Sequence, residues 1–104
     1  MLSNSLRLAV LGWAKTLATE VAGDGITVNC LCPGWPNTSL GDFEAMGKGM
    51  GTTAAEAQAY AERDNLQHRV LEPEELGPMA ALLAGPGGSG ITGQVISVDG
   101  GYKV

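Results

Sequence analysis

The stretch ITGQVISVDGG, residues 91–101, decides the fold that this sequence predicts. Residues 94–98 form a short β-branched run, which is typical of a buried strand. Asp99 and the two glycines after it predict a tight turn at the end of that strand, because glycine adopts backbone angles that other residues avoid. The chain therefore closes on a strand followed by a turn.

A second strand is predicted upstream, over residues 26–32, with the sequence ITVNCLC and a proline-glycine pair directly after it. Its β-branched residues and short length again favour a buried strand. Between the two strands, Pro73 sits among Glu72, Glu74 and Glu75, a pattern typical of a helix N-terminus. A strand, a helix and a strand in this order predict two parallel strands joined by a right-handed helical crossover.

The N-terminal part of the chain predicts a long helix over residues 2–21. Apolar residues recur there every three or four positions, and alanines widen the stripe. The stripe is made of Leu2, Leu6, Val10, Trp13, Leu17 and Val21. We expect it to be the buried face, with Trp13 packed against the sheet or a partner helix. Thr53, with Glu56 three residues later, has the capping-box spacing that predicts the start of another helix.

Composition excludes several classes of protein. Eleven acidic against six basic residues give a net charge of −5, which argues against a nucleic-acid surface. Cys30 and Cys32 share one face of the predicted strand, where neither a disulfide nor a metal site is favoured, so we expect no bound metal. No run of residues is long and apolar enough for a membrane span, and no signal peptide is recognisable. We expect a cytoplasmic protein.

Together with GITVN at residues 25–29 and PGW at residues 33–35, the closing stretch resembles the C-terminal part of the short-chain dehydrogenase/reductase family. The resemblance implies an α/β fold, the C-terminal part of a Rossmann-like doubly wound domain. Residues 1–104 would then form a single partial domain, with residues 39–68 as a flexible segment that covers the substrate. It also implies NAD or NADP as cofactor and hydride transfer between that cofactor and a carbonyl or alcohol.

The family's catalytic motif, Tyr-x-x-x-Lys, aligns with Ser3 and Arg7. A phenol can act as an acid or base when a nearby cation lowers its pKa, whereas a serine hydroxyl is far less acidic. We therefore expect Ser3 to hydrogen-bond a substrate oxygen without supplying its proton. Arg7 can hold a ribose or a phosphate, but it stays protonated and does not relay protons. The structural alternative is a helix N-cap at Ser3 and a solvated charge at Arg7.

Cofactor contacts are implied by resemblance at Pro33, Gly34 and Thr38, which correspond to the family's turn against the nicotinamide end. That position agrees with the rule that open α/β sheets bind ligands beyond the carboxyl ends of their strands. The family's glycine-rich dinucleotide turn is absent from this sequence. The glycines of residues 47–51 do not follow a predicted strand, so they are a poor substitute.

Three readings of function follow. The first is a truncated short-chain dehydrogenase/reductase-like protein that is inactive as a redox enzyme on its own. The second is a small homo-oligomeric module without redox chemistry, stable when paired with itself or with a partner that supplies the missing half. The third and weakest is a serine hydrolase, in which Ser3, Ser39 or Ser89 would pair with His68.

Overall fold

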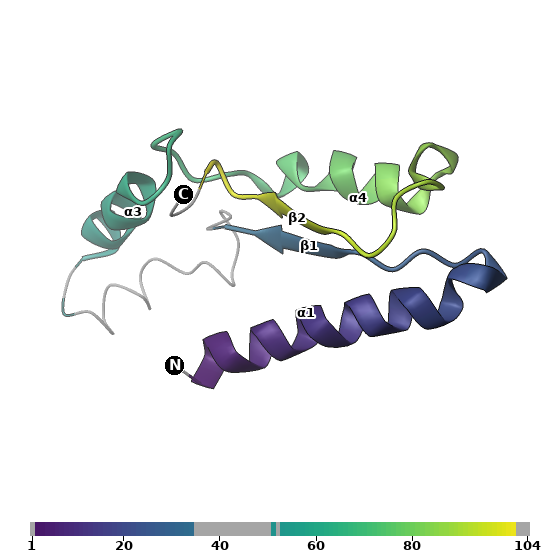
Figure 1. Ribbon diagram of the computed structural model, residues 1–104. Helices are drawn as coiled ribbons and strands as arrows, with labels where there is room; N and C mark the ends of the chain where they lie inside the picture. Colours follow the sequence, from purple (N-terminus) through teal and green to yellow (C-terminus); the bar gives the residue numbers. More distant parts are fainter. Residues whose placement is uncertain (1, 35–50, 52, 102–104) are drawn as a thin grey trace. The chain divides into compact units, whose positions relative to one another are not determined.

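The structure, a computed structural model, describes residues 2–34, 51 and 53–101 of the chain (Figure 1). They fall into two compact units. The first contains residues up to Leu31 together with Met79–Ile96, and the second contains Cys32–Pro78 together with the residues from Ser97 onward. None of the described helices is both long enough and apolar enough to cross a bilayer.

Helix α1 (Leu2–Val21) has the bounds that the periodicity predicts. A short 3-10 turn, η1 (Ala22–Asp24), follows it. Gly25 then takes up a left-handed conformation, with φ of 73°, and its N–H donates to the carbonyl oxygen of Ala22 at 3.1 Å. Glycine suits this position because a Cβ atom is disfavoured at positive φ. The helix therefore ends after Val21, as the predicted bounds of residues 2–21 require.

The face of α1 that is buried differs from the prediction. Ala14 and Ala18 are only 5% and 4% exposed, while Leu6, Val10 and Trp13 are 59%, 54% and 63% exposed. Small side chains let the helix lie close to the chain at Gly93, where an added Cβ atom would be 3.9 Å from that of Ala18. The alanine face therefore packs inside the first unit, and the expected burial of Trp13 against the sheet is wrong.

Strands β1 (Cys30–Pro33) and β2 (Val95–Val98) pair with each other. The N–H of Cys30 donates to the carbonyl of Gln94 at 2.8 Å, and the N–H of Gly34 to that of Val98 at 3.3 Å. Both pairs are separated by the same number of residues, so the strands are parallel, as predicted.

Both strands are shorter than expected, because side chains replace part of the ladder at their starts. The Asn29 amide nitrogen donates to the carbonyl of Ile91 at 2.9 Å, and its oxygen accepts the N–H of Gln94 at 3.1 Å. The N–H of Val28 donates to the hydroxyl of Thr92 at 3.1 Å.

The connection between the strands is helical, which confirms the α/β class. Helix α3 (Ala54–Arg63) begins after Thr53, whose hydroxyl accepts the N–H of Glu56 at 3.2 Å, as the capping-box spacing predicts. The helix expected at Pro73 opens as a 3-10 turn, η3 (Pro73–Glu75), and helix α4 (Gly77–Ala84) follows it. The turn η4 (Pro86–Gly88) ends α4.

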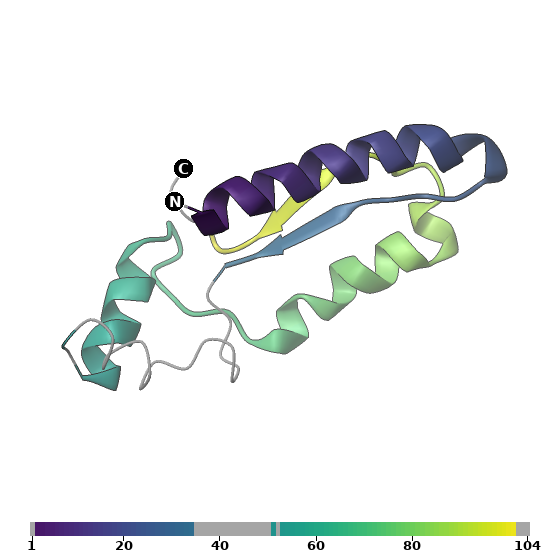
Figure 2. The same ribbon diagram turned by 90° about the horizontal axis from the view of Figure 1, so that it is seen from below.

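In the first unit, α1 and the residues of α4 from Met79 onward lie on opposite sides of the strand segments, as two perpendicular views show (Figures 1 and 2). Its buried apolar residues are Ala14 and Ala18. The second unit buries Ala57, Leu71 and the polar Asn65. Among the described residues few side chains are buried in either unit, and these contribute little apolar burial to offset the entropy of folding.

Candidate functional site

The carboxyl ends of β1 and β2 meet in the second unit at Gly34 and Asp99. A Cβ atom added to Gly34 would lie 2.8 Å from the Cβ of Asp99 and 3.1 Å from its Cα. Only a glycine fits this approach without displacing the chain. Open α/β sheets bind ligands at this edge. Gly34, one of the predicted cofactor residues, lies there in close contact with Asp99.

We expect Gly34→Ala to destabilise the chain by about 1–3 kcal/mol, the usual cost of forcing an extra methyl into a packed site. Gly12→Ala is the matched control, since no atom lies within 4 Å of a Cβ added at that position in α1. The control should raise stability by up to about 1 kcal/mol through helix propensity. Urea unfolding followed by circular dichroism measures both. An equal or higher unfolding midpoint for Gly34→Ala would contradict the close approach.

The turn after β2 has the predicted form. The N–H of Gly101 donates to Oδ1 of Asp99 at 2.9 Å, and Gly100 and Gly101 have φ of 70° and 83°. The turn is paired with residues 65–67 of the same unit: the N–H of Leu66 donates to the carbonyl of Gly101 at 3.3 Å, and that of Gln67 to Gly100 at 3.1 Å. The aspartate side chain therefore fixes the turn.

Asn65 holds the neighbouring loop. Its side chain is 5% exposed and bonds Arg69 twice, donating to the carbonyl oxygen at 2.7 Å and accepting the N–H at 3.3 Å. Sequence reasoning missed this residue. An asparagine before a turn is common, and nothing in its neighbours marks it as buried, although asparagine is a residue that bonds local backbone in this way.

Arg69 and Glu75 form a bidentate ion pair in the second unit, with Nη1 to Oε2 at 2.8 Å and Nη2 to Oε1 at 2.6 Å. The N–H of Glu72 donates to the same carboxylate at 2.7 Å, completing a capping box around η3. The hydrogen bond from Arg69, followed by that from Glu72, lowers the pKa of Glu75 to about 2. A lowered carboxyl pKa means that this contribution to stability is present above the ordinary value near 4.5 and is lost as the pH falls toward 2.

We therefore expect Arg69→Gln to raise the pKa of Glu75 toward its ordinary value, because the substitution removes the hydrogen bond from the Arg69 guanidinium to the Glu75 carboxylate. Carbon-detected NMR titration of the carboxyl groups measures this shift directly. Arg63→Gln is the control, because this substitution removes the same charge elsewhere in the unit. Arg63 lies over the ring of Tyr60, with its guanidinium carbon 5.7 Å from the ring centroid. Identical Glu75 titrations in the two variants would show that the ion pair does not set this pKa.

Ser3 and Arg7, the residues predicted to stand at the family's Tyr and Lys positions, lie in the first unit. The bounds of α1 place Ser3 inside the first helical turn, so it does not precede the helix as an N-cap would. Arg7 follows one turn later with an exposed side chain, and among the described residues it has no ion-pair partner. Pro33 is exposed and Gly34 is half-buried in the second unit. The candidate catalytic residues therefore belong to the first unit and the described candidate cofactor residues to the second.

The glycines of residues 85–90 do not offer a diphosphate cradle. Within this segment the N–H groups of Gly88, Ser89 and Ile91 donate to the carbonyls of Gly85, Pro86 and Gly88. A Cβ atom added at Gly88 would come within 2.8 Å of the Cα of Leu83. Gly88 therefore serves packing against the end of α4. Among the described residues nothing fits the diphosphate of a dinucleotide, and only Pro33 and Gly34 remain as candidates for its nicotinamide end.

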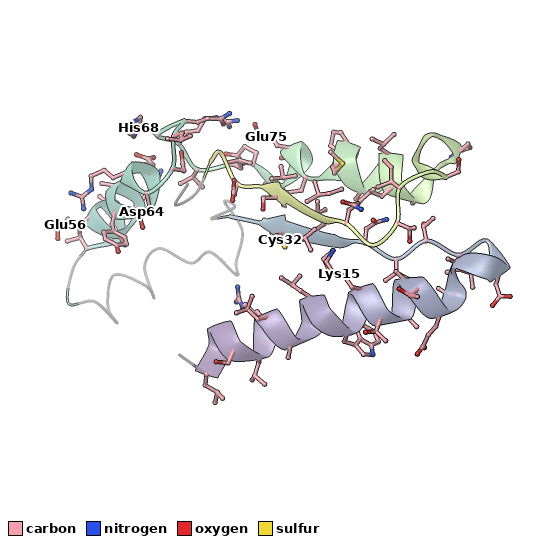
Figure 3. All side chains as sticks on the ribbon, viewed as in Figure 1. Lys15, Cys32, Glu56, Asp64, His68 and Glu75 are labelled. Atoms are coloured by element: carbon pink, nitrogen blue, oxygen red, sulfur yellow. The ribbon has the colours of Figure 1, made fainter. Side chains whose placement is uncertain are left out.

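Several predicted features lie outside the described residues. They are Thr38, Ser39, the glycines within residues 47–50, and residues 39–50 and 52 of the segment 39–68. The hydrolase reading gains no support from the remainder. His68 is exposed on a turn (Figure 3) at a φ of 52°, and in the described part of the chain its ring has no hydrogen-bond partner. The described side chains also contain no group of three His, Cys, Asp or Glu that would hold a metal ion.

Comparison with known proteins identifies the family. A family model described as enoyl-(acyl carrier protein) reductase matches residues 3–103. The chain belongs to the short-chain dehydrogenase/reductase family. A tropinone reductase homologue of Arabidopsis thaliana is 42% identical over 90 residues, covering 86% of this chain and 31% of the relative. The 3-oxoacyl-[acyl-carrier-protein] reductase FabG of Chlamydia trachomatis is 36% identical over 104 residues, covering 91% and 35%.

Solved structures of family members have the same fold. An NADPH-dependent reductase involved in bacilysin biosynthesis, YwfH, matches with a TM-score of 0.87 at 33% identity, over 100% of this chain and 40% of that protein. The actinorhodin polyketide ketoreductase, solved with NADPH, matches with a TM-score of 0.79 at 34% identity, over 90% and 37%. The predicted Rossmann-like class is confirmed. The chain spans about a third of the length of the curated relatives it matches.

Proposed function

We propose that the parent chemistry of this chain is hydride transfer between NAD(P)(H) and a carbonyl or alcohol, and that these 104 residues do not complete that transfer by themselves. The observation that carries the proposal is the family fold. It is supported by the resemblance, in which Ser3 and Arg7 correspond to the family's catalytic Tyr and Lys. Relatives and solved neighbours named as reductases support the reaction class. The free thiols of Cys30 and Cys32 favour a cytoplasmic location, where cysteines stay reduced.

The chemistry of the two positions supports inactivity. A catalytic acid or base works best with a pKa near the working pH, and an alcohol hydroxyl lies far from it. A serine hydroxyl such as that of Ser3 can donate a hydrogen bond to a substrate oxygen but is too weak an acid to act as a proton donor at neutral pH. Arg7 supplies a permanent positive charge. Pro33, Gly34 and Thr38 remain the proposed contacts for a nicotinamide ring, and the diphosphate would have to be held by other residues.

Two measurements on the purified chain test this proposal. Calorimetric titration with NADH and with NADPH should show no saturable binding at millimolar concentration. Absorbance assays with β-ketoester, diketone and cyclic ketone substrates should show no cofactor oxidation above the buffer rate. Turnover that is lost in both Ser3→Ala and Arg7→Ala would overturn the proposal, because it would show that the two residues form a working pair.

A second candidate function, a homo-oligomeric module, is favoured by two observations. The apolar stripe of α1 is left uncovered in the first unit, with Leu2, Leu6, Val10 and Trp13 between 54% and 74% exposed. Strand β1 also pairs, among the described residues, with β2 alone, which leaves one edge to accept a further strand. Uncovered apolar surface of this kind favours association.

Sedimentation equilibrium of the purified chain tests the module. A concentration-dependent mass above 10.6 kDa supports self-association, and a stable monomer over the micromolar range argues against it. A second experiment adds a chain that supplies the remaining two thirds of a family member. If the two chains assemble, a heterodimer should replace the homo-oligomer and bind the cofactor.

A further inference from the structure

A groove of about 430 Å³ runs along the side of α1 in the first unit, between the C-terminal half of the helix and the residues that lead into β2. The volume lies within the range of sites that hold small molecules. The residues that line the groove come from two places in the sequence and are Lys15, Ala18, Thr19, Ala22, Thr92 and Gly93.

The polar end of the groove carries hydrogen-bond donors. The Lys15 side chain extends from α1 toward the strands (Figure 3), and its ammonium donates to the carbonyl of Gly93 at 2.8 Å. An ammonium has three N–H groups, so two remain. The hydroxyl of Thr92 accepts the N–H of Val28 at 3.1 Å, which leaves its own hydrogen to be donated. Lys15 and Thr92 are thereby positioned by the fold before any ligand arrives.

The opposite end is apolar and close to the end of the helix. The methyl groups of Ala18 and Ala22 form its wall, and no carboxylate lines the groove. The carbonyls at a helix C-terminus carry partial negative charge, which disfavours an anion beside Ala22. Negative charge is therefore favoured at Lys15, and a neutral apolar group is favoured at Ala22.

We propose that this groove binds a small monocarboxylate with a short alkyl chain. The carboxylate would accept from the Lys15 ammonium and the Thr92 hydroxyl, and the alkyl chain would lie over Ala18 and Ala22. One cation and one hydroxyl match the two oxygens of a carboxylate, whereas a phosphate dianion is better satisfied by more donors and a second charge. The proposal does not depend on the oxidoreductase function, because none of these residues belongs to the candidate catalytic or cofactor site.

Titration of the ¹⁵N-labelled chain with sodium hexanoate, followed by amide NMR shifts, tests the proposal. The amides of Thr19, Thr92 and Gly93 should shift in a saturable manner, and equal concentrations of sodium chloride should leave them in place. Affinity should rise from acetate to hexanoate by up to about fourfold per buried methylene. Hexanamide, which has the same chain without the charge, should not bind.

Two variants identify the groove as the site. Lys15→Met should weaken hexanoate binding by about tenfold or more, the usual loss for a hydrogen bond to a charged group, while Lys15→Arg should retain it. Lys15→Met also breaks the hydrogen bond to Gly93, so a second variant is needed that keeps this bond. Ala22→Leu keeps it and fills the apolar end of the groove. This variant should reduce the affinity for hexanoate to that for acetate.

Three results would overturn the proposal: unchanged hexanoate binding in Lys15→Met, binding of hexanamide as tight as that of hexanoate, or inorganic phosphate bound more tightly than hexanoate. None of these depends on redox activity. A failure here is thus separable from a failure of the proposed oxidoreductase function.

Discussion

Carbonyl reduction by a chimera is expected to rise by about 10²–10⁴-fold when Ser3 and Arg7 are changed together to tyrosine and lysine, the range that a well-placed acid or base contributes. In the chimera this chain replaces the matching part of the bacilysin-pathway reductase. The match covers 100% of this chain and 40% of the reductase. That scaffold supplies the rest of a family member. The measured quantity is kcat for NADPH oxidation.

The control separates proton transfer from folding and binding. Ser5→Tyr with Arg7→Lys adds the same side chains but places the phenol two residues away, on another side of α1. It should stay at the rate of the unmodified chimera. The affinity for NADPH should be similar in all three proteins. High activity in the unmodified chimera would show that a serine and an arginine are sufficient, and the proposed cause of inactivity would be wrong.

The sequence predicts the elements of this fold well because their signals are local. The bounds of α1, the glycine stop at Gly25, the hydroxyl cap at Thr53 and the aspartate turn at Asp99 each depend on a few neighbouring residues. The buried face of α1 is not local. Two stripes, one of alanines and one of larger residues, share the helical period, and close approach to Gly93 selects the alanines.

The candidate site is less predictable because most of its contacts join residues that are far apart in the sequence. Gly34 was placed at the correct edge, but its contact with Asp99 depends on the pairing of strands that lie 64 residues apart, as the N–H of Gly34 to the carbonyl of Val98 shows. The double hydrogen bond of Asn65 to Arg69 depends on the path of a loop. Lys15 reads as an ordinary solvated helix charge until the structure places it on the carbonyl of Gly93.

Leu6→Glu is expected to convert the proposed homodimer of this chain into a monomer. The large residues of the apolar stripe of α1, Leu2, Leu6, Val10 and Trp13, are uncharged, and two copies can pair through this stripe by a two-fold axis that gives each side the same contacts. In an antiparallel pair centred near residue 11, Glu20 of one copy lies beside the first helical turn of the other. That turn has no acidic residue of its own, and its macrodipole favours negative charge.

The two-fold axis doubles the effect of each substitution. Loss of a buried leucine costs about 1.5–3 kcal/mol in each copy, so Kd should rise by about 10²–10⁴-fold. Leu8→Glu is the matched control: Leu8 is 67% exposed, close to the 59% of Leu6, but it lies on another side of the helix. In a Trp35→Phe background Trp13 is the sole tryptophan, and its emission should shift to the blue with concentration in Leu8→Glu but not in Leu6→Glu. Equal dissociation by both substitutions would mean that added charge, rather than this face, controls assembly.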